Sequence, residues 1–216
     1  VPIKDTGLVA GFGLYAPFTA IVQYPEDGAQ RFTIQDALIA TVYMTPSLAY
    51  KVNDMFSFGA GVSFVLGYAE LSRVQDFAEV SDLGAGLEGP PVNQENDFGP
   101  DAPVGVRELD VLARPTEFKH MIATGVTFNV GGAVDLGRAR ISAAYQHSVA
   151  LDFRGDFSLD MDDDFFTQDL ESQGLDFPPL VEGDASLSFT LPNMLHLGAA
   201  FDVNDRMTLT GAFSYY

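Results

Sequence analysis

The chain has 216 residues, of which 47% are hydrophobic, enough for one domain with a large apolar core. A formal net charge of −19 argues against a nucleic-acid partner, because phosphates need a basic surface. The absence of Cys excludes disulfides, thiolate metal sites and Cys nucleophiles. No apolar run reaches the roughly 18 residues of a membrane-spanning helix, so any crossing of a membrane must be made by strands.

Alternation of apolar and polar residues predicts seven strands, because side chains of a strand point to opposite faces in turn. They begin near Gly7, Gln35, Met55, Glu117, Arg138, Asp184 and Arg206. The clearest is the strand from Met55, where an apolar face with Phe56, Phe58 and Phe64 opposes a face of Gly, Ser and Ala. One face of such a strand contacts an apolar medium, and the other face lines an interior space with small residues.

The same alternation assigns faces in the later strands. From Arg138 to Arg154 it places Leu151 and Phe153 on the oily face, with Asp152 and Arg154 opposite, where we expect a structural ion pair facing inward. From Leu187 to Val203 it predicts one continuous apolar face. Only His147 and Asn193 interrupt these apolar faces.

Strand length and loop asymmetry favour a membrane barrel. The strands exceed the usual five or six residues and approach or exceed the roughly 9 to 11 that a tilted strand needs to cross a bilayer. Short turns alternate with long polar connections, as in outer-membrane barrels. The turns fall at Val52–Asp54, Asp135–Gly137 and Asn204–Asp205, and the long connections at residues 23–33, 75–116 and 156–184.

The predicted fold is therefore an all-β, antiparallel transmembrane β-barrel. Bacterial barrels have an even number of strands, and an open sheet would leave unpaired edges in lipid, so we expect residues 1–216 to be part of a single barrel domain. The alternative is a two-sheet β-sandwich, a binding module whose acidic loops could hold calcium, since a sandwich shows the same alternation.

Several segments resemble the FadL/TodX family of outer-membrane transporters of long-chain fatty acids and hydrocarbons. They follow the family's order and cover most of the chain, at Gly13–Phe18, Thr45–Val62, Ala144–Phe157 and Leu187–Arg206. The resemblance implies a monomeric 14-stranded barrel with an N-terminal hatch, which carries hydrophobic molecules by passive diffusion and releases them sideways into the bilayer. The hatch and the closing C-terminal strands have no counterpart in this chain.

The resemblance also implies a head-group site at Arg73. Alternation points Arg73 into the lumen near the outer end, and in the family's register it falls where an inward Arg holds the substrate's head group. A guanidinium offers a bidentate fit to a carboxylate. The alternative is an ion pair with loop acids such as Glu70 or Asp76.

The long connections carry more apolar residues than a solvated loop needs. As the family's outer loops do, they could build an external groove for alkyl chains; the alternative is that they pack the loops onto the barrel mouth. We expect substrate contacts from Leu83, Leu87, Phe165, Phe166, Leu170 and Phe177, with Phe165, Phe166 and Leu170 on one face of a short helix.

Pro17, between Ala16 and Phe18, should interrupt its strand, because Pro lacks the N–H that a ladder needs. Relatives place their lateral exit at a kink in this strand, so Ala16–Pro17–Phe18 is the candidate portal; a Pro tolerated on an edge strand is the plainer alternative.

No catalytic or metal constellation stands out. We therefore expect no enzyme activity and no cofactor, and outer-membrane lipid and lipopolysaccharide as neighbours. The acidic run Asp160–Asp164 lacks the Gly and terminal Glu of a calcium loop, which favours a solvated tip. A non-specific polar porin would need charged lumen walls instead of the Gly, Ser and Ala of these strands.

Overall fold

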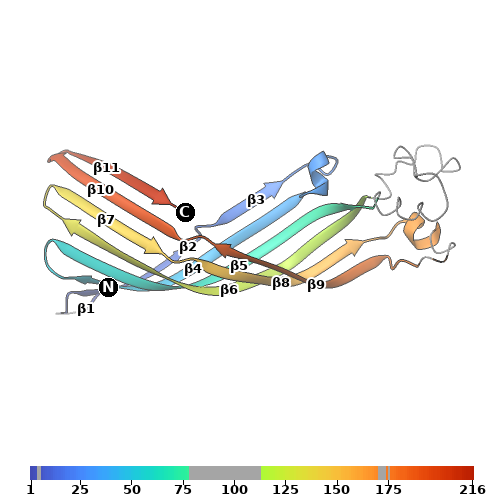
Figure 1. The fold of residues 1–216 in the computed structure, drawn as a ribbon, viewed down its shortest axis with the longest axis horizontal. Coiled ribbons are helices and arrows are strands. Elements are labelled where there is room, and N and C mark those ends of the chain that lie inside the picture. Colours follow the sequence, from blue (N-terminus) through green and yellow to red (C-terminus); the bar gives the residue numbers. More distant parts are fainter. Residues whose placement is uncertain (4–5, 78–112, 170–173, 175) are drawn as a thin grey trace.

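A computed structural model describes residues 1–3, 6–77, 113–169, 174 and 176–216 (Figure 1). They form one antiparallel sheet of 11 strands. The strands are β1 (Pro2–Ile3), β2 (Leu8–Tyr15), β3 (Thr19–Gln23), β4 (Asp36–Lys51), β5 (Phe56–Asp76), β6 (Ala113–Asp135), β7 (Ala139–Gln146), β8 (Val149–Asp160), β9 (Leu180–Leu191), β10 (Met194–Asn204) and β11 (Met207–Tyr215). Two short helical turns, η1 (Ala29–Phe32) and η2 (Phe165–Asp169), complete the elements. None of the helices in these ranges has the length and apolarity to cross a bilayer.

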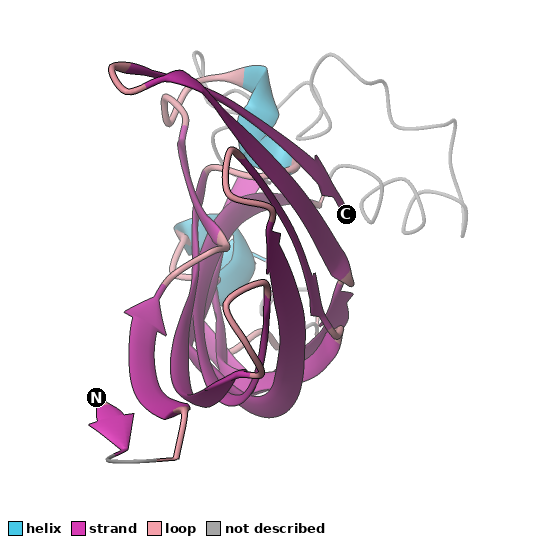
Figure 2. Cartoon of the chain, turned by 90° about the vertical axis from the view of Figure 1, so that its left-hand side faces the viewer, coloured by secondary structure: helices cyan, strands magenta, loops and turns pink. Residues whose placement is uncertain are grey.

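The strands follow the order β1-β2-β4-β5-β6-β7-β10-β11, with β3 on β4, β8 on β6 and β9 on β8. Figure 2 shows the sheet curved into a trough. A β-sandwich needs two facing sheets, so the sandwich alternative is wrong. The predicted tight turns are present around Asn53, Leu136 and Asp205, at the end of the sheet that lies to the left in Figure 1.

The seven predicted strands are present, but three of them are broken in two. Residues 16–18 separate β2 from β3, His147–Ser148 separate β7 from β8, and Pro192–Asn193 separate β9 from β10. β4 and β6 run unbroken past the first two breaks and pair with both pieces there. β9 and β10 pair in turn with β8 and β7. The breaks divide the sheet into two halves.

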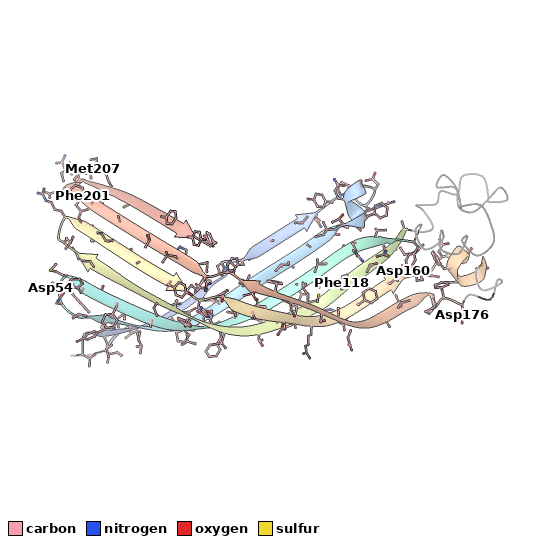
Figure 3. The ribbon with its side chains drawn as sticks, in the orientation of Figure 1. Asp54, Phe118, Asp160, Asp176, Phe201 and Met207 are labelled. Carbon is pink, nitrogen blue, oxygen red and sulfur yellow. The ribbon has the colours of Figure 1, made fainter. Side chains whose placement is uncertain are left out.

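We call these the turn half and the loop half. The turn half, which carries the short turns, consists of β2, β7, β10, β11 and residues 43–51, 56–66 and 122–135 of β4, β5 and β6. The loop half, which carries the long connections, consists of β3, β8, β9 and the remainder of β4, β5 and β6. In Figure 3, Asp54, Phe201 and Met207 mark the turn half, and Phe118 and Asp160 mark the loop half.

In the turn half the convex face is apolar. Exposed side chains on it are Phe12, Leu14, Leu48, Phe58, Phe64, Val126, Phe128, Ile141, Leu197, Phe201, Leu209 and Phe213. From Phe56 to Leu66 this belt covers ten steps, about 33 Å along a strand, which at a tilt of about 40° gives about 25 Å of height. That is the height of the lipid-facing band of an outer-membrane barrel. The concave face here carries small or polar residues around a hollow of about 530 Å³, among them Ser57, Ala133, Ser142 and Gly198.

In the loop half the faces are exchanged. Leu151 and Phe153 are fully buried on the concave side, whereas Asp152 and Arg154 are exposed on the convex side. Arg154 pairs with Ile122, an exposed residue of the convex face. The predictions that Leu151 and Phe153 face outward and that Asp152 and Arg154 face inward are therefore wrong. The extra residues at the break at His147–Ser148 shift the alternation by one position.

β9 and β10 show the same shift. Leu191 and Met194 are both buried on the concave side, but Leu195 and Leu197 are exposed on the convex side. The predicted continuous apolar face from Leu187 to Val203 is thus two faces, one on each side of the wall. Because of this exchange, the apolar residues of the turn half lie on the convex face and those of the loop half lie on the concave face.

If the turn half alone lies in lipid, Phe64→Arg on the convex face should lower the free energy of unfolding by about 2–4 kcal/mol, because the charge enters hydrocarbon. Ser186→Arg, on the exposed face of β9 in the loop half, should cost less than about 1 kcal/mol. Urea unfolding of the full-length protein in lipid vesicles measures both. Similar costs at the two positions would contradict the assignment of the halves.

Candidate functional site: the apolar chamber and its mouth

The concave side of the loop half and of its junction with the turn half is filled by one apolar cluster, which we call the chamber cluster. Its buried members are Tyr43, Val65, Ala69, Met121, Ala123, Val149, Leu151, Phe153, Ala185 and Leu191, with Phe18, Ile39, Leu71, Phe118, Phe157, Leu187 and Phe189 packed against them. Five strands and the break before β3 contribute to it. It is an apolar region inside the trough that begins at the upper end of the lipid-facing belt.

Phe153 lies at the centre of this cluster. Its ring stacks on Phe189 of β9, with ring centres 5.1 Å apart. It also lies directly over Gly67 of β5, where a Cβ would come within 2.6 Å of the ring. Gly125 of β6 similarly accommodates Val149 and Leu151. Glycines in β5 and β6 therefore let large β8 side chains lie flat on the inner wall.

A polar layer lies beneath the chamber cluster, toward the turn half. The hydroxyls of Thr45 and Ser63 are 2.8 Å apart, and Thr45 also donates to the Tyr15 hydroxyl at 3.4 Å. The Tyr15 and Tyr43 rings stack at 5.4 Å. The buried Thr45 and Ser63 hydroxyls thus have each other as hydrogen-bond partners, as buried polar groups require.

At the outer end a second cluster, the mouth cluster, closes over the sheet. It consists of Met161 and Phe166, which are buried, with Phe77, Leu159, Phe177 and Val181 packed around them. The Phe166 ring meets the Phe77 and Phe177 rings edge-on, each with 5.8 Å between centres. Of the predicted substrate-contact residues, Phe166 and Phe177 lie in this cluster, where they pack the loop onto the mouth; their contact with a substrate stays a prediction.

Arg114 holds this loop to the sheet. Its guanidinium is 8% exposed, donates from Nε to the Asp160 carbonyl at 2.9 Å and lies 3.5 Å from an Asp163 carboxylate oxygen. Its Cζ is 6.0 Å from the centre of the Phe166 ring. Sequence reasoning missed Arg114, because it lies at the end of a long polar connection and nothing in its neighbours indicates burial.

Arg73 reaches the concave face beside Arg114. It pairs across the ladder with buried Thr116, and Gln75, two residues on, pairs with Arg114. The side chain of Arg73 is exposed and donates from Nη2 to the Gln75 amide oxygen at 2.9 Å. Within the described ranges Arg73 forms no ion pair, and Glu70 instead accepts a hydrogen bond from the Tyr68 hydroxyl.

Some predicted contact residues cannot be placed. Leu83, Leu87 and Leu170 lie outside the described residues. Phe165 is the first residue of η2, but its side chain also lies outside the described part.

The predicted interruption at Pro17 is present. Ala16 and Pro17 are exposed, and Phe18 turns inward onto the chamber cluster. The Phe18 carbonyl accepts hydrogen bonds from the backbone N–H and the hydroxyl of Thr41, at 2.9 and 3.0 Å. This break therefore stays attached to β4 while its Phe contacts the chamber.

A curved antiparallel sheet with an apolar belt outside and small residues inside is the wall of a transmembrane β-barrel. The family described as outer membrane protein transport protein (OMPP1/FadL/TodX) matches residues 1–216. The chain belongs to this family, and its place is the bacterial outer membrane. No curated protein matches it.

Solved structures show the same fold. A Pseudomonas aeruginosa FadL homologue is 23% identical with a TM-score of 0.74, over 99% of this chain and 46% of that one. The Ralstonia pickettii toluene transporter TbuX is 17% identical with a TM-score of 0.64, over 98% and 51%. The Pseudomonas putida toluene transporter TodX is 16% identical with a TM-score of 0.62, over 99% and 52%. This chain spans about half the length of these relatives.

Proposed function

We propose that this chain forms part of an outer-membrane channel through which hydrophobic molecules pass by passive diffusion. The observation that carries the proposal is the exchange of faces between the two halves. A barrel that only had to stand in lipid would need an apolar convex face and nothing more, yet the loop half turns Leu151 and Phe153 inward. Two of the similar structures are toluene transporters, which agrees with a hydrophobic substrate.

In this proposal the mouth cluster collects the substrate, and the chamber cluster holds its apolar part. Long-chain fatty acids and hydrocarbons both fit such surroundings, because burial of an alkyl chain gains about 0.8 kcal/mol per CH₂. The substrate then leaves sideways at Ala16–Pro17–Phe18, where the strand is interrupted and Phe18 contacts the chamber. The lateral route is favoured because Leu151 and Phe153 are fully covered and obstruct a straight path along this wall.

Arg73 takes the polar end of an acidic substrate. Its guanidinium points to the concave face, is exposed and has one described hydrogen bond, so further N–H groups can bind a carboxylate. Its neighbour Arg114 adds positive charge in a chain that is otherwise strongly acidic.

Removal of this guanidinium tests the assignment. Arg73→Ala should weaken binding of a long-chain fatty acid about 5- to 10-fold, the effect expected of one charged contact at an exposed site. Binding of an alkane of equal length should be unchanged. Arg154→Ala is the matched control, since Arg154 lies on the convex face. Titration of the full-length protein in detergent measures all three, and equal losses for acid and alkane would remove the head-group role.

We further propose that the channel works as a monomer and that the convex face of the loop half meets lipopolysaccharide. Arg154, Asp156, Glu182 and Asp184 are exposed there, above the apolar belt that ends at Leu66. Carboxylates at this height can accept hydrogen bonds from the sugar hydroxyls of that layer and would be costly among lipid tails.

A further inference from the structure

The wall of the barrel has a gap between β6 and the strand formed by β7 and β8. β6 pairs with β7 from Asn129 to Asp135 and with β8 from Thr116 to Ile122. Among the described residues, 123–127 of β6 have no ladder partner on this edge, although β5 pairs with them throughout on the other. Next to them the Phe128 carbonyl accepts a hydrogen bond from the His147 N–H at 2.9 Å, and the Thr127 hydroxyl donates to the His147 carbonyl at 2.7 Å. The break at residues 16–18 is smaller, since only Thr41 and Val42 of β4 lie between its two ladders.

This gap lies at the height of the lipid belt. The β5 partners of Thr124 and Val126 are Leu66 and Phe64, which are exposed on the convex face, as is Val126 itself. Backbone N–H and C=O groups without partners are costly in hydrocarbon and are tolerated where protein covers them or a polar space adjoins them. A gap of five residues at this depth therefore requires a cover.

The cover is the first part of β8. Val149 and Leu151 lie on Gly125 from the concave side, so close that a Cβ there would be 2.5 Å from Val149 Cγ2. Both side chains belong to the chamber cluster. An apolar molecule in the chamber is thus separated from lipid at this point by a single strand segment that has no ladder to β6.

The β8 segment of residues 149–153 ends in irregular backbone on both sides, which suits a hinge. At its lower end the breaks at His147–Ser148 and Pro192–Asn193 lie side by side, because Asn193 Oδ1 accepts from the Ser148 N–H at 2.9 Å and from the Tyr145 hydroxyl at 2.7 Å. Above them, residues 149–153 pair with residues 187–191 of β9, so the two segments form one ribbon. At the upper end β8 rejoins β6 at a bulge where His120 has a positive φ of 53°.

We propose that this ribbon, residues 149–153 with 187–191, is the door of a second lateral outlet, through which slender apolar or single-chain amphipathic molecules pass from the chamber to the bilayer. The proposal rests on the transport function proposed above. Swinging about the paired breaks, the ribbon uncovers the β6 edge. Thr124 and the uncovered backbone groups of β6 then offer hydrogen bonds to a departing head group, while the side chains of Val126 and Phe128 meet its tail.

The absence of Cys from the chain allows a direct test by cross-linking in the full-length protein. Continuing the Ile122–Arg154 register by two residues sets Thr124 opposite Asp152, both on the convex face. Thr124→Cys with Asp152→Cys, joined by a short reversible thiol cross-linker, ties the door to β6. Val62→Cys with Phe128→Cys is the matched control, because these residues are direct ladder partners in the same belt.

Uptake of a fluorescent long-chain fatty acid into proteoliposomes is the readout. Because the break at residues 16–18 stays open, cross-linking of the door pair should lower the rate about twofold, and reversal of the cross-link should restore it, while the control pair leaves the rate unchanged. An unchanged rate with the door tied would assign the exit elsewhere and overturn this outlet. If the untied protein shows no uptake either, the proposed transport function fails instead.

Discussion

Gly155→Ala should cost the folded barrel about 3 kcal/mol, at the upper end of what overpacking does in a tightly packed site. Gly155 lies where β8 rejoins β6, and a Cβ there would be 2.4 Å from the Lys119 carbonyl oxygen and 2.8 Å from the backbone of Met121. Because these are backbone atoms, no side chain can turn away, and β8 must move off the sheet. The pairs Lys119–Asp156 and Ile122–Arg154 would be lost with it.

The measurement is urea unfolding of the full-length protein in detergent. Gly183→Ala is the control, because Gly183 lies on the neighbouring strand β9 and a Cβ there meets nothing within 4 Å. It should be neutral or slightly stabilising, by about 0.4–1 kcal/mol, since the unfolded chain loses freedom. Equal midpoints for the two variants would show that the junction at Gly155 is not tightly packed.

The strands could be predicted because alternation with a period of two is a local property. Phe56, Phe58 and Phe64 occupy one face of β5 as expected, and the turns at Asn53, Leu136 and Asp205 lie where the pattern ends. The small-residue face of β5 also lies on the concave side, as the alternation indicates.

The exchange of faces could not be predicted from the same pattern. At each of the three breaks the apolar alternation continues in the sequence. At the first two the backbone shifts the register against β4 or β6 by a residue. At the third, β9 and β10 keep a constant register against β8 and β7 and so follow their change of side. The sequence pattern therefore assigns Leu151 and Ile141 to the same face, although Leu151 is buried on the concave side and Ile141 is exposed on the convex side. His147, Asn193 and Pro17 are the local signals of the breaks, and a polar residue on an apolar face does not by itself reveal a change of side.

The site was predicted in part for a related reason. Arg73 continues the alternation of β5, so its direction followed from local sequence. The burial of Arg114 depends on residues 46 or more positions away, Asp160 and the loop that follows it, and no short pattern contains that information. The inward position of Phe166 depends on the same contacts.

Arg114→Met should release the loop that follows β8 from the mouth. The substitution keeps apolar bulk beside Phe166 but removes the hydrogen bond to the Asp160 carbonyl and leaves the partly buried Asp163 carboxylate without this partner. Loss of one member of a buried ion pair costs about 3–5 kcal/mol. With Asp163 partly exposed, we expect about 3 kcal/mol, which makes local opening about 100-fold more frequent.

Hydrogen exchange of the full-length protein shows this opening directly. The N–H groups of Phe166 and Thr167 bond to the Asp163 carbonyl at 3.1 and 3.0 Å, so their exchange should accelerate when the loop detaches. Lys51→Met is the control, since its pair with Asp54 is exposed in a tight turn and contributes at most about 1 kcal/mol. Unchanged exchange at Phe166 and Thr167 would mean that the aromatic contacts with Phe77 and Phe177 hold the loop without Arg114, and the mouth would then be closed by apolar packing alone.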